Sequence, residues 1–205
     1  MVDSSNVVYD SNDSNVMVYN KLATSRKTVV LTFDDGPGRV LPEILDILKE
    51  EKVPAAFFWQ ARLLYPKRPW KRVMDEGHMI GTHSAKHNNL VNLQLNGQHQ
   101  DLQYSKSKIE SITGQEVKYF RPPFGQYNND TISAAKKLGL TPVMWRISSM
   151  DWELKDRPEQ IITNVTDNLE DGAIILLHEL PQTVEALPDL IAEVRRKDYE
   201  FTLLT

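Results

Sequence analysis

Two adjacent acidic residues end an apolar run near the start of the sequence, in the segment TFDDGP at residues 32–37. The glycine and proline that follow them favour a tight turn, in which the side chains of Asp34 and Asp35 diverge. One carboxylate could therefore bind a metal ion while the other accepts a proton. A solvated turn is the alternative, and an Asp-Asp-Gly sequence by itself favours that alternative.

Two histidines at i, i+4 spacing, His83 and His87, lie in the segment HSAKH. On a helical turn this spacing places both imidazoles on one face, within reach of one ion. The chain has no cysteine, so a metal site must use histidine and carboxylate ligands. Two imidazoles and one carboxylate suit Zn²⁺ and leave a position open for water, although Co²⁺, Ni²⁺ or Mn²⁺ could occupy such a site. A chance surface pair is the alternative.

A stiff loop follows Arg121 in the segment RPPFG at residues 121–125. Pro122 and Pro123 restrict the backbone and present the next amide, that of Phe124, at a fixed angle, where it could stabilise an oxyanion. The Arg121 guanidinium could hold a carboxylate in place and keep it ionised. A structural loop with an exposed arginine is the alternative.

Two further polar positions adjoin apolar residues: Asp151 precedes Trp152, and His178 follows Leu176 and Leu177. His178 could donate a proton to a leaving group if Asp151 positions the imidazole and favours its charged form. Trp152 and Leu176 could form an apolar pocket beside it. Each of these residues could instead belong to the core.

Short apolar runs that alternate with amphipathic stretches predict the elements that position these residues. We expect seven strands, at 28–33, 55–59, 78–82, 117–121, 141–147, 173–178 and 201–204. We expect helices at 41–51, 68–76, 98–113, 129–138, 158–169 and 182–196. The repeated strand-helix order indicates an α/β fold, either an open doubly wound sheet or a closed barrel. In both, chemistry gathers at the carboxyl ends of the strands, where the polar residues fall.

The composition limits the partners and the organisation of the chain. A formal net charge of −4 lacks the positive balance of a nucleic-acid binder, and no run approaches the ~18 apolar residues of a membrane span. A length of 205 residues suits one domain. We expect residues 1–26 to form a loosely packed N-terminal lead-in without an export signal, and residues 27–205 to carry the chemistry.

Together the five segments resemble the polysaccharide deacetylase family, also called the NodB-homology domain or carbohydrate esterase family 4. The match covers about residues 27–205 and joins TFDDGP, HSAKH, RPPFG, the Asp151-Trp152 pair and LLH in one order. Five short motifs in that order are far more specific than any of them alone. The resemblance implies a distorted (β/α) barrel with about seven parallel strands in a single domain.

The resemblance also implies an activity, the removal of N-acetyl groups from N-acetylglucosamine residues of a polysaccharide such as peptidoglycan or a chitin-type polymer. Asp35, His83 and His87 would bind one divalent ion, and we expect this ion to be Zn²⁺. Asp34 would be the base that activates water on this ion, and Arg121 would tune that base.

The remaining roles concern the leaving group and the substrate. By the same resemblance, His178 would be the acid that protonates the departing amine, and Asp151 would tune its acidity. The Phe124 amide would face the oxyanion, while Trp152 and Leu176 would enclose the acetyl methyl group. The residues expected to contact substrate are Pro123, Phe124, Trp152 and Leu176.

Several positions depart from the family pattern: the loop at residues 38–41 is shorter than in many relatives, and Ala56 stands where threonine is common. Glu179 follows His178 where aspartate is common, and Trp59 and Gln60 replace small residues. We expect these changes to affect the shape of the substrate site more than the chemistry.

Three rival functions use the same fold. A carbohydrate-binding pseudoenzyme is disfavoured because every acid, base and ligand of the expected mechanism is present. A hydrolase of small cyclic amides and an acetyl-ester hydrolase acting on xylan stay open. Relatives usually act outside the cell or at its envelope, so we expect that location and a precursor with an export signal; a cytoplasmic location is the alternative, and the oligomeric state stays open.

Overall fold

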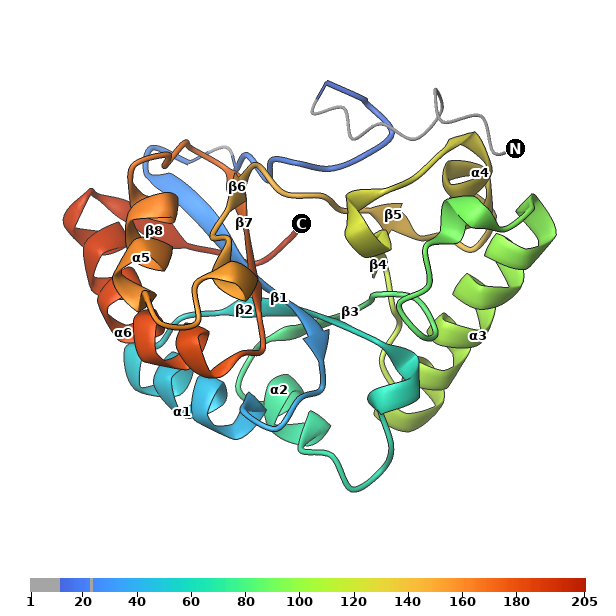
Figure 1. Ribbon diagram of the computed structural model, residues 1–205, viewed down its shortest axis with the longest axis horizontal. Helices are drawn as coiled ribbons and strands as arrows, with labels where there is room; N and C mark the ends of the chain where they lie inside the picture. Colours follow the sequence, from blue (N-terminus) through green and yellow to red (C-terminus); the bar gives the residue numbers. More distant parts are fainter. Residues whose placement is uncertain (1–11, 23) are drawn as a thin grey trace.

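The computed structural model describes residues 12–22 and 24–205 (Figure 1). Its strands form a single sheet with the order β5-β4-β3-β2-β1-β7-β6, and β8 pairs with β1. Every pairing between these strands is parallel. The strands are β1 (Lys27–Gly36), β2 (Ala55–Trp59), β3 (Met79–Thr82), β4 (Tyr119–Phe120), β5 (Thr141–Pro142), β6 (Ile147–Ser148), β7 (Ala173–His178) and β8 (Tyr199–Phe201).

β1 is the central strand and is buried along most of its length. Such a strand is covered on both faces, as in other parallel sheets. Leu31 and Phe33 belong to the main core. Val30 packs in a second, smaller cluster on the other face. Because side chains alternate along a strand, Thr32 and Asp34 lie on the same face as Val30.

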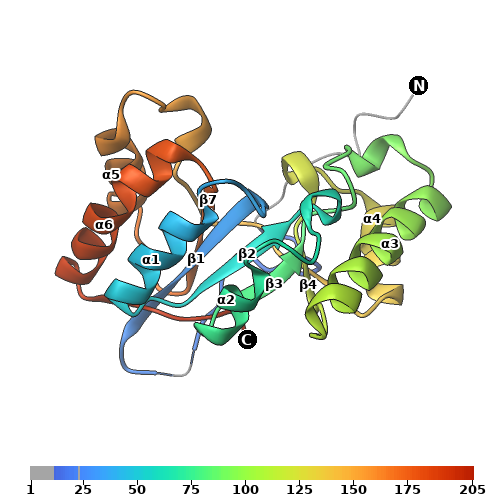
Figure 2. The same ribbon diagram turned by 90° about the horizontal axis from the view of Figure 1, so that it is seen from below.

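Helices cover the outside of the curled sheet: α1, α5 and α6 lie on one side and α3 and α4 on the other (Figure 2). Proline occupies the first turn of α1, α5 and α6, where a missing amide hydrogen costs nothing. α3 ends at Gly114, whose φ of 70° is left-handed. The helices are α1 (Leu41–Glu51), α2 (Trp70–Asp75), α3 (Leu95–Thr113), α4 (Asn129–Lys137), α5 (Pro158–Thr166) and α6 (Pro181–Arg196).

The distorted barrel expected from the sequence is confirmed, although one predicted strand is wrong. The segment 141–147 is not continuous, because β5 and β6 stand at opposite ends of the sheet order. Between them the chain bonds elsewhere: the Met144 amide donates to the Met17 carbonyl at 2.8 Å. The last predicted strand, 201–204, is also displaced, since β8 begins at Tyr199 and ends at Phe201.

The described part of the predicted lead-in packs against the barrel (Figure 1). The Met17 amide donates to the Pro142 carbonyl at 2.9 Å, and the Asn20 amide donates to the Gly172 carbonyl at 2.7 Å. Val16 and Val18 are buried. This segment therefore links the end of β5 to the start of β7, while residues 1–11 and 23 of the lead-in lie outside the described residues. No helix among the described residues has the length and apolarity needed to cross a membrane.

Candidate active site

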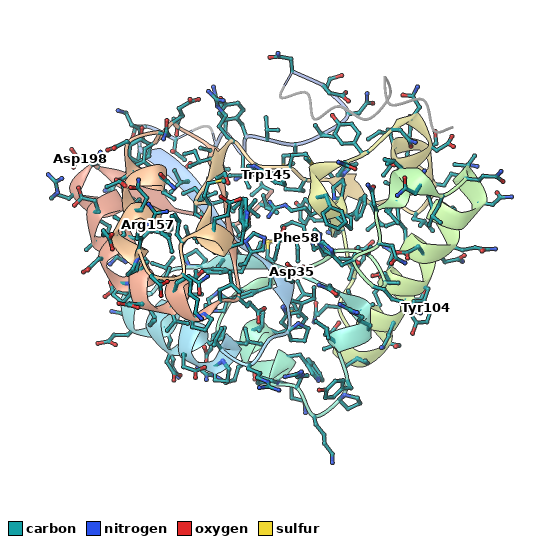
Figure 3. All side chains as sticks on the ribbon, viewed as in Figure 1. Asp35, Phe58, Tyr104, Trp145, Arg157 and Asp198 are labelled. Carbon is teal, nitrogen blue, oxygen red and sulfur yellow. The ribbon has the colours of Figure 1, made fainter. Side chains whose placement is uncertain are left out.

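Five of the predicted polar residues line one cavity of about 390 Å³ at the carboxyl ends of the strands, whereas the other two, Arg121 and Asp151, are fully buried and do not line it. Figure 3 shows Asp35 and Trp145 near the centre of the view, where this cavity lies, with Tyr104 and Asp198 on the outside. The sequence-predicted residues that line it are Asp34, Asp35, His83, His87, Phe124, Trp152, Leu176 and His178. The ends of β1 and β7 and the loops that follow β3, β4 and β6 supply them, as the parallel topology requires.

Asp35, His83 and His87 form a cluster that can hold one metal ion. One ligand atom from each lies within 4.8 Å of the others. Asp35 Oδ1 is 3.5 Å from His87 Nε2 and 3.9 Å from His83 Nε2. Ligand atoms around one tetrahedral Zn²⁺ are separated by ~3.3 Å, given bonds of about 2 Å. The three donors thus fit a divalent ion after small adjustments, and their chemistry suits Zn²⁺.

The orientation of His83 is fixed by a backbone partner. Its Nδ1 lies 2.8 Å from the Arg121 carbonyl oxygen. A carbonyl can only accept, so Nδ1 carries the proton and donates it, which leaves the Nε2 lone pair facing the cavity. Histidine ligands of metals are commonly fixed in this way.

The two histidines lie on a turn rather than on a helix, which corrects the expected helical turn. Ser84 and His87 have φ values of 69° and 61°, both left-handed. The His87 amide donates to Ser84 Oγ at 2.9 Å and stabilises the turn. The His87 ring also contacts Phe124 edge-on at 4.5 Å. The imidazoles therefore converge through a compact loop conformation, which their sequence spacing also permits.

The charges of the cluster favour forms that can bind a cation. Burial by itself would raise the pKa of Asp35. The nearby His83 and His87 and a hydrogen bond from Gln60 outweigh burial, so the pKa lies below its usual value. Burial lowers the pKa of the His87 imidazole, and the neighbouring His83 lowers it again. An ionised carboxylate and a neutral imidazole are the ligand forms that a metal requires.

Arg121 is a buried anchor for Asp34 rather than an exposed loop residue. The guanidinium is fully buried and its Nη1 donates to Asp34 Oδ1 at 2.8 Å. Nη1 also donates to Thr32 Oγ1 at 2.7 Å, and Nη2 donates to the Met144 carbonyl at 2.9 Å. Asp34 Oδ2 lies 3.7 Å from His83 Nε2. One oxygen of Asp34 is thus held by Arg121, while the other faces the metal cluster.

His178, which lines the cavity, forms a second pair with Asp151, which is fully buried. His178 Nδ1 donates to Asp151 Oδ1 at 2.7 Å, since a carboxylate oxygen accepts, and the His178 amide donates to Oδ2 at 2.7 Å. Thr183 Oγ1 also donates to Oδ2, at 2.6 Å. Burial lowers the pKa of His178, but the hydrogen bond and charge of Asp151 outweigh burial and raise the pKa above its usual value. His178 is therefore suited to act as an acid near neutral pH.

Aromatic and apolar side chains form the walls of the cavity. Trp152 is 43% exposed and contacts the His178 ring edge-on at 5.2 Å, while Phe124 is 60% exposed. Leu176 lies in the wall, whereas Pro123 is buried and its neighbour Pro122 lines the cavity. Such exposed aromatic side chains can pack against a ligand.

Three functional neighbours escaped the sequence reasoning. Trp145 lines the cavity, but it falls within the predicted strand 141–147 and was not among the predicted site residues. Leu180 lines it as well, two residues after His178. Gln60 was expected to alter only the shape of the substrate site, yet its Nε2 donates to Asp35 Oδ1 at 2.7 Å. The sequence feature that could have pointed to this role was that Gln60 replaces a small residue of the family pattern.

Glu179 also reaches the loop that follows β1. Its side-chain oxygens accept hydrogen bonds from Trp59 Nε1 at 2.8 Å and from the Gly38 amide at 2.5 Å. A Cβ added to Gly36 would lie 1.7 Å from Glu179 Oε1, so only glycine fits there. The departures Trp59 and Glu179 are thus partners in one buried contact.

Comparison with known proteins gives a family and several relatives. The family model described as polysaccharide deacetylase matches residues 21–143, which include Asp35, His83 and Arg121. Asp151 and His178 lie beyond the matched part. The chain is 37% identical to the putative polysaccharide deacetylase YheN of Bacillus subtilis (strain 168) over 94% of this chain and 74% of the relative.

Two further relatives differ in what they are said to do. A peptidoglycan-N-acetylglucosamine deacetylase of Bacillus cereus is 32% identical over 96% of this chain and 78% of its own length. The structure of a family 4 carbohydrate esterase pseudoenzyme from Bacillus anthracis is similar with a TM-score of 0.79 and 30% identity, covering 86% of this chain. The match spans 63% of that pseudoenzyme, less than two thirds of its length. On its matched sequence and on its fold, the chain belongs to the polysaccharide deacetylase family.

Proposed function

We propose that the protein is a metal-dependent hydrolase that removes N-acetyl groups from N-acetylglucosamine residues of a glycan, outside the cell or at its envelope. The observation that carries the proposal is that one cavity is lined by a three-ligand cluster, by Asp34 paired with buried Arg121 and by His178 paired with buried Asp151. Metal-assisted amide hydrolysis uses three such parts: a Lewis acid, a base for water and an acid for the amine. The Bacillus cereus relative is named for this reaction on peptidoglycan.

Asp35, His83 and His87 would hold the ion, and the ion when bound supplies a Lewis acid for the acetamide carbonyl and for the attacking water. Asp34 accepts the proton of that water. Because Arg121 occupies Asp34 Oδ1, the proton goes to Oδ2, the oxygen nearer to His83. The same hydrogen bond keeps Asp34 in one orientation.

His178 donates a proton to the departing amine nitrogen. Since Nδ1 is committed to Asp151, the proton leaves from Nε2. Asp151 is fully buried and accepts three hydrogen bonds, so it holds the imidazole in a single position. Trp152 lies against this ring and would enclose the acetyl methyl group together with Leu176.

The Phe124 amide would bind the oxyanion. Phe124 has a left-handed φ of 60° inside the 3-10 turn Pro123–Gly125, a conformation that turns its amide away from the regular hydrogen-bonding pattern. Among the described residues no acceptor pairs with this amide, whereas the next two amides donate to Pro122 and Pro123. An unpaired N–H beside the metal cluster supports the assignment.

A pseudoenzyme with the same fold is the alternative that the Bacillus anthracis structure raises. Fold alone cannot separate the two, because function depends on the site. The complete set of proton donors and acceptors supports an active enzyme here.

Product analysis tests the proposal. The protein would be incubated with N-acetylglucosamine oligomers and, separately, with acetylated xylan, and acetate and free amine would be measured together. We expect equal amounts of acetate and amine from the oligomers and none from Asp34→Asn. Release from xylan alone would assign an ester hydrolase, and no release from either substrate would assign a binding protein.

A further inference from the structure

Gln60 contacts the predicted metal cluster from behind the cavity wall. Its side chain is buried, with only 5% of the residue exposed, and it does not line the cavity. Its Nε2 donates to Asp35 Oδ1 at 2.7 Å. This oxygen is the one that approaches both histidines, at 3.5 Å from His87 Nε2 and 3.9 Å from His83 Nε2. Gln60 therefore binds the very atom that would be the carboxylate ligand.

The orientation of the Gln60 amide follows from its other neighbour. Arg62 Nε lies 2.8 Å from Gln60 Oε1. A guanidinium has donors and no acceptor, so the amide oxygen must face Arg62 and the NH₂ group must face Asp35. A flipped amide would place two acceptors together at Asp35 and two donors together at Arg62. Arg62 thus fixes the direction in which Gln60 donates.

Asp35 depends on this contact because little else fixes its side chain. The carboxyl is 42% exposed, and Gln60 is the one residue of the described chain whose side chain donates a hydrogen bond to it. The backbone at Asp35 is in the left-handed region, with φ of 68°. Gln60 also holds Gly36, the residue after Asp35, since the backbone amide of Gln60 donates to the Gly36 carbonyl at 2.9 Å. One residue therefore fixes both the backbone and the carboxylate of the loop.

The uncharged amide suits this position. A lysine or arginine side chain in its place would repel the cation, and a carboxylate would repel Asp35. The positive charge of Arg62 stays on an exposed side chain, separated from the cluster by the amide. Residues that orient metal ligands in this way commonly change metal affinity by ~10- to 100-fold when they are lost.

We propose that Gln60, held by Arg62, is a positioning residue that fixes Asp35 for metal binding. The inference rests on the metal site of the proposed function and goes beyond it by assigning a role to a residue outside the cavity. Its consequence is a lower affinity for the ion when the Gln60 amide is removed, while the ion, once bound, still meets the same three ligands.

The test compares metal affinity in matched variants. Gln60→Met keeps the length of the side chain and removes the donor, and Arg62→Met leaves the amide free to flip. Gln98→Met is the control, because Gln98 is a fully buried glutamine whose Nε2 donates to the Leu93 carbonyl in another part of the fold. Dissociation constants for Zn²⁺ and Co²⁺ would be measured by competition with a chelator, and thermal unfolding would be recorded without metal.

We expect Gln60→Met to weaken binding by ~10- to 100-fold, Arg62→Met to weaken it less, and Gln98→Met to leave it unchanged. Acetate release by Gln60→Met should recover at saturating metal. Equal dissociation constants for the parent protein and Gln60→Met would overturn the inference alone. A parent protein that binds no ion would overturn the metal site and with it this role for Gln60.

Discussion

Glu179 is a buried acid that should make the protein less stable as the pH rises through the neutral range. It is 9% exposed, and its carboxyl oxygens accept hydrogen bonds from the Gly38 amide and from Trp59 Nε1. Burial raises its pKa from 4.5 to about 7, against the lowering effects of the Gly38 amide, Trp59 and Arg68. The perturbation that isolates this effect is Glu179→Gln, which keeps the size of the side chain and removes the titration.

The sign follows from proton binding. Between pH 4.5 and about pH 7 the folded state binds more protons at Glu179 than the unfolded state, so the free energy of unfolding falls as pH rises. The stabilisation is complete below the unfolded pKa and is lost as pH passes the folded pKa. Each pKa unit corresponds to about 1.4 kcal/mol, so the rise from 4.5 to about 7 corresponds to about 3 kcal/mol.

The assay is urea unfolding of the parent protein and Glu179→Gln across this pH range, in the presence of a chelator so that no metal contributes. Taking the difference between the two proteins cancels the titration of other groups. Both carboxyl oxygens of Glu179 accept from an N–H donor, so the NH₂ group of a glutamine would face one of these donors. This contact adds a penalty of about 1–3 kcal/mol to Glu179→Gln that does not depend on pH. The control is Glu116→Gln, at a side chain that is 68% exposed.

We expect the free energy of unfolding of the parent protein to fall by about 3 kcal/mol relative to that of Glu179→Gln between pH 4.5 and a pH above 7. A difference that stays constant over this range would refute the reasoning, because it would mean that Glu179 has the same pKa in the folded and unfolded states.

Three other predictions concern the site. Arg121→Met should destabilise the fold by about 3–5 kcal/mol in urea unfolding, because it leaves buried Asp34 without its partner. Adding Asp34→Asn to the same chain should recover part of that loss. If the losses of the two single variants simply add in the double variant, this prediction is contradicted. Asp151→Asn removes the interactions that raise the pKa of His178, so less of the acid is protonated at high pH. The alkaline limb of the kcat profile should therefore move to lower pH, and an unmoved limb would exclude His178 as the acid. Phe124→Ala should raise KM while changing the free energy of unfolding by less than about 0.5 kcal/mol, because the side chain is 60% exposed; an unchanged KM would remove Phe124 from the substrate site.

The sequence predicted the strand ends of the site well because the order of strands and helices is a local pattern. Apolar runs such as Ala173–His178 end in the polar residues that line the cavity. Parallel strands place those ends on one side of the sheet, so Asp34 and His178 could be expected together. They do lie opposite each other in the register of β1 and β7.

The remaining features depend on long-range partners that no local pattern reveals. In the sequence, Gln60 is only a polar residue that follows a strand. Its contact with Asp35 arises because β2 pairs with β1, which the local sequence does not show. The segment 141–147 is apolar enough for a strand, yet its middle bonds to Met17 from the far end of the chain. His83 and His87 converge on a turn with left-handed residues, whereas their spacing alone favoured a helix.

The central claim is that one ion held by Asp35, His83 and His87 serves a reaction in which Asp34 is the base. The most direct test is to add Zn²⁺ stepwise to metal-stripped protein, and to measure bound metal and acetate release from N-acetylglucosamine oligomers on the same samples. We predict that acetate release rises with bound metal and saturates at one ion per chain, that His83→Ala loses both, and that Asp34→Asn binds the ion but releases no acetate. Acetate release that does not follow bound metal, or that persists in Asp34→Asn, would contradict the account.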